Sequence, residues 1–427
     1  MYFSKSLIVF LLFFFTFQGF AQDSTKYIAD GTQGEVMKAA EPDTLNFRER
    51  FDGWNEFDGS LTTLKLGLGF LYEYANYIQN DAAATQMDSA DLELIPAGKI
   101  RDVRFLMSGQ FKFKRSIVWK IGVMYDGPTD TWFVRETGLM VHVPELFGYF
   151  FIGRTKEGFS LNKVMNGYSG WTMERQMAID VIPILADGIK WMGFLPKSRI
   201  IWNAGYYNDV FSEGQSFSTY KWQVAGRVGW LPVYSDDGKT LVHIGINARY
   251  GEVYNDIMRL KSRPEAFPAP YFLDTKDFAA DQSIHVGYEA YYRNGSFMLG
   301  SEFYLHKFHS PETNNPLFHG GEIVATYILT GEVRPYTTVS GIFGFVPVAR
   351  PITKGGPGAV EAVLRFSTLD LNSGNLEGGS FWRITPMINW YPTSKVRLEL
   401  AYGYGVLDRF ELEGATQFFQ GRVQVVF

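Results

Sequence analysis

Apolar and polar side chains alternate along most of the chain from Leu61 onward. In residues 396–404, for example, valine, leucine and tyrosine occupy every second position, and arginine, glutamate and small residues lie between them. A repeat of two residues is typical of a β-strand whose two faces meet different surroundings. The same repeat occurs in residues 64–74, 103–113, 117–125, 224–230 and 242–250. The pattern predicts an all-β protein.

These segments have the length and the ends of strands that cross a membrane. Each is about ten residues long and several end in aromatic residues, as tilted membrane strands do. A soluble β-sandwich also alternates, but the segment length and the aromatic content of 17% favour the membrane version. We therefore predict a transmembrane antiparallel β-barrel, in one domain, over residues 61–427. Its apolar faces are expected to contact lipid and its polar faces to line the lumen.

The connections between the segments differ in length. Residues 236–238, 294–295 and 392–395 are short turns with the Asp, Asn, Gly and Pro residues that such turns favour. Residues 161–179, 252–284 and 347–359 are long stretches without a clear repeat. Outer-membrane barrels carry short turns at one end and long loops at the other, and we expect that arrangement here.

Both ends of the chain predict export to the outer membrane. Residues 1–21 contain Lys5, an apolar run and small residues before Gln22, which is the pattern of a cleaved signal peptide. Residues 22–60 are polar and without a repeat, and we expect a flexible lead-in. The last strand alternates up to a terminal Phe427, the ending that the barrel-assembly machinery of Gram-negative bacteria engages.

Composition and motifs exclude most other chemistry. There is no cysteine for a disulfide or thiol, and a net charge of −5 argues against a nucleic-acid binder. The chain has no P-loop and no Gly-x-Ser-x-Gly motif. His306 and His309 would point to opposite faces of a strand, so we expect no shared metal. We predict that the protein is not an enzyme and binds no metal or cofactor.

Basic residues occupy several of the predicted lumen-facing positions, and rings of such residues attract anions in a narrow passage. Inward Glu73 and Glu399 fit a second reading, in which a wide lumen carries both signs simply to stay hydrated. The lumen-facing basic positions are Lys65, Arg104, Lys112, Lys114, Lys120, Arg227, Arg249 and Arg397.

Several segments together resemble the phosphate-selective porin O/P family of Gram-negative outer membranes. In chain order they include GRTKEGFSL (153–161), WTMER (171–175), SRPE (262–265), YILTGE (327–332) and NWYP (389–392). The resemblance covers residues 153–427. It implies a barrel of about 16 strands, a homotrimer, and a long loop that folds inward to narrow the pore. It also implies passive diffusion of small anions such as phosphate, with no nucleic acid or cofactor involved.

The resemblance also implies where an anion would bind. Its residues here are Arg154, Lys156, Lys163, Glu174 and Arg175, and Arg175 next to Glu174 is the clearest match. Glu174 and Arg175 could equally pin the loop to the barrel wall by ion pairing. Two other functions stay open: a non-selective small-solute pore, and a plugged barrel that acts through its long loops as an enzyme or adhesin.

Overall fold

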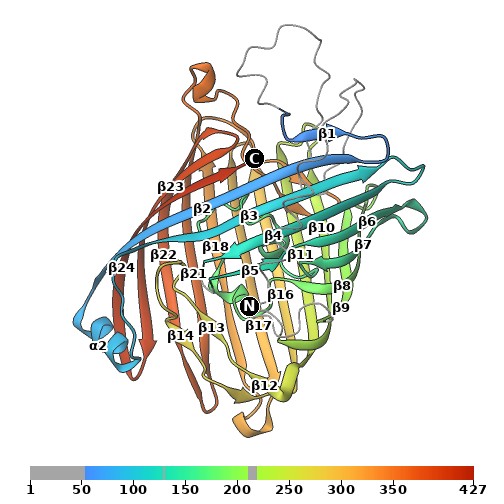
Figure 1. Cartoon of the computed structure of the whole chain (residues 1–427). Helices are drawn as coiled ribbons and strands as arrows, with labels where there is room; N and C mark the ends of the chain where they lie inside the picture. Colours follow the sequence, from blue (N-terminus) through green and yellow to red (C-terminus); the bar gives the residue numbers. More distant parts are fainter. Residues whose placement is uncertain (1–52, 128–129, 210–218) are drawn as a thin grey trace, which may run out of the picture.

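The computed structural model describes residues 53–127, 130–209 and 219–427, and these residues form a closed antiparallel barrel (Figure 1). The predicted signal peptide and most of the predicted lead-in lie outside the described residues. The barrel closes where β2 pairs with β24. Its sixteen strands are β2 (Thr63–Gln79), β3 (Ala97–Phe111), β4 (Ile117–Asp126), β6 (Thr137–Val143), β7 (Gly148–Thr155), β8 (Ala186–Leu195), β9 (Ile200–Asn208), β10 (Tyr220–Tyr234), β11 (Thr240–Val253), β16 (Gln282–Asn294), β17 (Phe297–His309), β18 (Leu317–Ile328), β21 (Ala359–Ser373), β22 (Leu376–Thr393), β23 (Val396–Arg409) and β24 (Leu412–Val426).

The predicted fold class is confirmed, and the alternation has the expected cause. In β23, Arg397 and Glu399 point inward and are buried, whereas Leu400 and Tyr402 are exposed on the outside. A strand with one face to lipid and one to the lumen needs this repeat. No helix among the described residues is long and apolar enough to cross a membrane.

Two further strands lie beside the barrel. β5 (Thr131–Val134) pairs with β4, and β1 (Glu56–Asp58) pairs with the start of β2. The end of the predicted lead-in is therefore a strand. Lys65 and Lys112 hold it in place through ion pairs with Glu56 and Asp58, at 3.0 and 2.5 Å.

The helices are short. Asn80 caps α2 (Asp81–Ser89) by accepting a hydrogen bond from the amide of Ala83, and the buried Gln86 ties the helix to the β23–β24 turn through three backbone carbonyls. The other helical turns are α3 (Leu161–Val164), η3 (Pro144–Leu146), η4 (Met177–Ile179), η5 (Tyr254–Asp256), η6 (Pro311–Thr313) and η7 (Ile352–Lys354).

Three long connections fold into the barrel: loop A (residues 156–185), loop B (residues 254–281) and loop C (residues 329–358). Loop A contains α3 and η4. Small hairpins brace the other two, and they pair β12 (Ile257–Met258) with β15 (Phe278–Ala279), β13 (Lys261–Ser262) with β14 (Leu273–Asp274), and β19 (Tyr336–Thr337) with β20 (Ile342–Phe343).

The inward loops enter from both ends of the barrel, which differs from the expected separation of short turns and long loops. Loops A and B start at the end opposite the C-terminus. Loop C starts at the C-terminal end, because Ala359 after it pairs with Tyr391 just before the β22–β23 turn. The composition of a loop does not reveal at which end of the barrel the loop lies. That end depends on how many strands precede the loop, because each strand runs in the opposite direction to the one before it.

The loops build two apolar cores inside the barrel. Trp171 of loop A and Phe343 of loop C pack on Tyr291 of the wall, and all three are buried. Nearer the opposite end, Phe272 of loop B packs on Phe381 and Phe418. Much of the lumen is thus filled by side chains, as in a soluble core.

Candidate functional site

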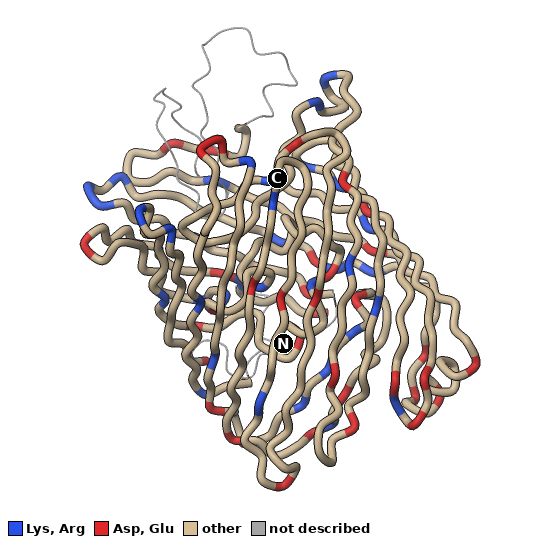
Figure 2. Tube along the Cα trace, turned by 180° about the vertical axis from the view of Figure 1, so that it is seen from behind, with Lys and Arg blue, Asp and Glu red and all other residues tan. Residues whose placement is uncertain are grey.

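Charges of both signs lie side by side on the strands (Figure 2), and the loops divide them into two groups. On the inner wall of β10 to β23 the basic side chains are buried and bind carboxylates or carbonyl oxygens. Arg227 binds Glu289, Arg249 binds Glu157 and Arg397 binds Glu399. None of the three arginine side chains is more than 2% exposed. These ion pairs hold the loops against the barrel wall.

The inner wall of β3 and β4 and the β5–β6 link behave differently. Arg101, Lys120 and Glu136 keep 25%, 30% and 26% of their side-chain surface exposed. Lys120 points into the barrel because its neighbour Ile121 takes the outward position, and Arg101 reaches inward to Glu174 of loop A. Water therefore reaches this sector of the lumen, and the loops cover the other.

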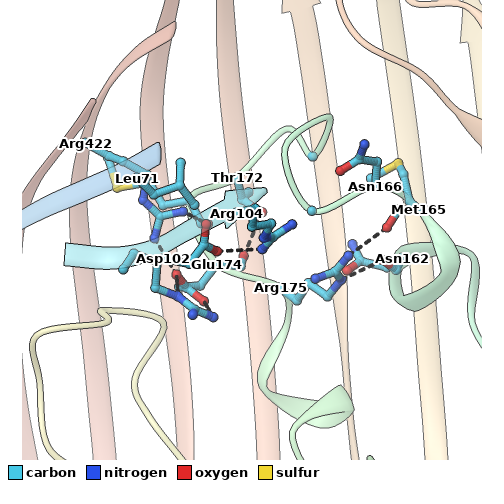
Figure 3. Close-up of a pocket in the computed structure, with 14 residues that line it drawn as sticks. Leu71, Asp102, Arg104, Asn162, Met165, Asn166, Thr172, Glu174, Arg175 and Arg422 are labelled. Carbon is cyan, nitrogen blue, oxygen red and sulfur yellow. Dashed lines mark hydrogen bonds and ion pairs between the residues drawn. The ribbon is translucent and has the colours of Figure 1, made fainter. Parts of the chain in front are cut away.

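A pocket opens in this sector, between β2, β3, β24 and loop A (Figure 3). It is lined mostly by charged side chains from the wall and by the turn after α3. The lining residues are Leu71, Arg101, Asp102, Arg104, Asn162, Met165, Asn166, Gly167, Gly170, Thr172, Met173, Glu174, Arg175 and Arg422.

Glu174 pins loop A to the barrel wall. Its carboxylate accepts a hydrogen bond from Nε of Arg101 at 2.9 Å and pairs with Arg422, which also binds Glu73. Burial raises the pKa of the Glu174 carboxyl, but the charges of Arg101 and Arg422 outweigh it and bring that pKa down to about 2. Of the two roles open to Glu174 on sequence grounds, its contacts are those of a structural ion pair.

Arg175 has no ion pair among the described residues and binds backbone instead. Its Nε donates to the carbonyl of Asn162 at 2.9 Å and its Nη2 to that of Met165 at 2.7 Å. Lys156 donates to the same Met165 oxygen at 2.5 Å. Burial, and then the charge of Arg104, lower the pKa of Arg175, while burial and the charge of Arg175 hold the pKa of Lys156 well below its ordinary value.

Arg104 and Arg175 border the same space. A β-carbon at Gly167 would lie 3.5 Å from Nη1 of Arg175 and 3.7 Å from Nη1 of Arg104. Among the described residues neither Nη1 atom has a hydrogen-bond partner, because the other nitrogens of both groups make the contacts. The absence of a side chain at Gly167 leaves room next to two free guanidinium edges.

Further cationic side chains lie along the wall next to Arg104 and Arg175. Glu136 lies in the field of Lys120, Arg135, Lys156 and Lys190, and the aromatic ring of Phe151 lies between the ammonium groups of Lys120 and Lys190, 5.3 and 5.4 Å from its centre. Asp102, Glu136 and Glu174 are carboxylates that act on these cations. The cationic cluster, as we call it, consists of Arg104, Lys120, Arg135, Lys156, Arg175 and Lys190.

The residues expected from the sequence fall into five groups, and one prediction is wrong: Lys114 is exposed in the turn after β3 and does not face the lumen. Arg104, Lys120, Lys156 and Arg175 belong to the cationic cluster, and Glu174 lines the pocket beside it. Arg154 makes a double hydrogen bond to Asp187 and Lys163 a buried ion pair with Glu157, so both cations are compensated. Lys65 and Lys112 hold β1, and Arg227, Arg249 and Arg397 lie on the covered wall.

Sequence reasoning missed Arg101, Arg135, Lys190 and Arg422. For Lys190 and Arg422 the signal was present, because outward apolar residues flank each of them in a strand. Arg101 is in the β3 strand where the register with β2 shifts, which hides its direction from a simple repeat. No group of three or more His, Asp or Glu side chains in the described part of the chain could hold a metal ion.

Comparison with known proteins agrees with this architecture. The family model described as phosphate-selective porin O and P matches residues 74–427. An uncharacterized protein of Caulobacter vibrioides is 28% identical over 188 residues, a stretch that covers 43% of this chain and 37% of that relative. The match therefore spans little more than a third of the relative's length.

Solved outer-membrane barrels share the fold at low identity. The outer membrane protein OmpT of Vibrio cholerae, in a form lacking loop L8, is 13% identical with a TM-score of 0.54, over 86% of this chain and 100% of that one. An anion-selective porin from Comamonas acidovorans is 12% identical with a TM-score of 0.51, over 86% and 100%. The outer membrane channel DcaP of Acinetobacter baumannii is 9% identical with a TM-score of 0.54, over 87% and 99%.

Proposed function

This chain belongs to the phosphate-selective porin O and P family, and from that premise we propose that it lets small anions, phosphate or related oxyanions, diffuse passively across the outer membrane. The route would follow the inner wall of β3 and β4, where Arg101 and Lys120 keep exposed surface, since the loops cover the wall of β10 to β23. Diffusion needs no covalent step and no cofactor.

One observation carries the proposal: the unpaired Nη1 atoms of Arg104 and Arg175 on the same space at Gly167. Guanidinium groups bind oxyanions through paired N–H bonds, and two such groups from different elements suit an anion with several oxygens. Lys156 beside them adds a point charge. In a sector with restricted water such charges act more strongly than on an open surface.

The proposed partners follow from the family. A homotrimer in outer-membrane lipid is supported by the V. cholerae OmpT structure described as a trimer form, at a TM-score of 0.50 over 86% of this chain. The terminal Phe427 would serve assembly into the membrane by the barrel-assembly machinery. The signal peptide of residues 1–21 would direct export.

The filled half of the lumen favours a second candidate. Loops A, B and C leave apolar cores where a wide pore would hold water. A barrel plugged in this way could act through its outer loops as an adhesin or enzyme, without conducting solutes. A wide non-selective pore fits less well, because four arginines and two carboxylates line the pocket of the open sector.

Solute uptake into proteoliposomes separates these functions. Purified protein would be reconstituted, and the entry of labelled phosphate, of an uncharged sugar and of rubidium ion compared. Faster entry of phosphate than of rubidium ion supports the anion porin. Equal entry of all three indicates a non-selective pore, and no entry through protein shown to be folded indicates a plugged barrel.

A further inference from the structure

Glu302 lies in β17, on the wall opposite the pocket. Its carboxylate accepts four hydrogen bonds, and none of them comes from a cationic side chain. Ser160 Oγ donates to it at 2.7 Å and the amide of Asn162 at 2.9 Å, both from loop A. The hydroxyls of Tyr291 and Tyr304 donate to it from the wall. Glu302 is fully buried, so its carboxylate depends on these bonds.

Asn162 connects this carboxylate to Arg175. Its amide donates to Glu302 and its side-chain Nδ2 to Glu322 at 3.0 Å, while its carbonyl oxygen accepts from Nε of Arg175 at 2.9 Å. Two carbonyl oxygens therefore set the plane of the Arg175 guanidinium, that of Met165 and that of Asn162, and the wall holds Asn162 at two points. If Asn162 moved, the free Nη1 edge would turn with it.

The position of Glu302 carries an electrostatic cost that a residue with a purely structural role would not need. Glu289 and Glu322 lie directly opposite it on the two neighbouring strands, and like charges in that register repel. Arg227 offsets Glu289, and Arg365 lies 3.6 Å from Glu322. Glu302 has neutral donors alone, and two of its four belong to loop A.

We propose that Glu302 is a positioning residue for anion selection: through Asn162 it orients Arg175 toward the pocket. The inference rests on the proposed anion porin and adds a residue on the far wall to its selectivity. Glu302 itself would not contact the permeating ion, since it is buried beneath loop A. Removing its charge should act only through Arg175.

The test is a double-mutant cycle on the chloride-to-potassium permeability ratio, measured in planar bilayers with the full-length protein. Glu302→Gln turns one acceptor oxygen into a donor that cannot hold both loop contacts. We expect the ratio to fall about 2- to 5-fold, in the lower part of the range in which residues acting through others modulate coupling, and by less than the loss of Arg175 itself causes. In an Arg175→Gln background the same change should have no further effect, because the group it orients is gone.

Glu289→Gln is the matched control, since it is buried in the neighbouring strand position and its hydrogen bonds go to Arg227, His243 and Asn247 instead of loop A. It should leave the ratio unchanged. A folded Glu302→Gln channel with the wild-type ratio would overturn the proposal. So would an equal loss in the wild-type and Arg175→Gln backgrounds, which indicates a general structural effect.

Ser160→Ala keeps the proposal testable if Glu302→Gln fails to fold. It removes one loop donor and leaves the carboxylate with three. The permeability ratio should fall again, by less, and again only when Arg175 is present; an unchanged ratio argues against the proposal. A wild-type channel without anion preference would instead contradict the proposed function, and this inference would fall with it.

Discussion

Lys156 and Arg175 donate hydrogen bonds to one acceptor, the backbone carbonyl oxygen of Met165. A carbonyl carries only a partial charge, so it orients two cations without neutralising either. Lys163, seven residues after Lys156, is instead paired with a buried carboxylate, Glu157. Within one loop, the structure thus separates cations that act on the pocket from a cation that holds the loop.

Replacing Arg175 should reduce anion preference. Arg175→Gln removes one charge from the edge of the pocket and should lower the chloride-to-potassium permeability ratio about five- to tenfold, since a unit charge about 4 Å from an ion is worth on the order of 1 kcal/mol even in water. Arg175→Lys keeps the charge but loses the planar fork. It should retain chloride preference and lose block by phosphate. Reversal potentials with and without phosphate measure both, and an Arg175→Gln channel like wild type would remove Arg175 from the account.

Filling the space at Gly167 should weaken phosphate binding without changing any charge. A methyl group there would lie 3.5 Å from Arg175 and 3.7 Å from Arg104, ordinary contact distances that occupy the place of an anion. Gly167→Ala should raise the phosphate concentration that halves the chloride current. Gly170→Ala is the control, because its methyl group would meet no atom closer than 3.6 Å and neither guanidinium. Identical block in the two variants would contradict a binding site at Gly167.

The strands were predictable because a local repeat encodes them. In β23, the alternation of Arg397 and Glu399 with apolar residues follows from lipid on one side and a polar lumen on the other. Loop C was not predictable as an inward loop, because its anchors are distant in sequence: Phe343 packs on Tyr291 and on Trp171. No local pattern records such contacts.

The site was predictable in part for the same reason. The resemblance pointed to loop A and to Arg175, which does border the pocket. The resemblance does not predict the ion pair between Lys163 and Glu157, because that pair depends on how α3 packs against the wall. Arg104 lies near Arg175 because a turn of loop A reaches β3. The two residues are distant in sequence, so a local repeat does not predict their contact.

Anion preference should fall as the pH rises, and the fall should begin at a lower pH than the titration of an ordinary lysine. Burial and the neighbouring Arg175 lower the pKa of Lys156, so it loses its proton, and its positive charge, at a lower pH than a free lysine. Arginine stays charged over this range. Permeability ratios at about pH 6 and about pH 9, on either side of neutrality, measure the effect. In Lys156→Met the ratio should start lower and depend less on pH; an unaltered pH dependence would show that another group titrates.

Lys163→Met should cost stability and leave selectivity unchanged. Its ammonium group lies 2.9 Å from Glu157, both side chains are fully buried, and Arg249 shares the same carboxylate oxygen. Losing a charged hydrogen bond of this kind costs about 1.5–3 kcal/mol. Urea unfolding followed by tryptophan fluorescence should shift to lower denaturant, while the permeability ratio stays at the wild-type value. The opposite pattern, a changed ratio with unchanged stability, would place Lys163 on the ion route.

Selection of anions by the open sector of the lumen can be measured as the reversal potential of the wild-type channel in a planar bilayer under a KCl gradient, followed by addition of phosphate. We expect a reversal potential displaced toward that of chloride and a chloride current that low phosphate reduces. A reversal potential displaced toward that of potassium, or a chloride current that phosphate leaves unchanged, would contradict it.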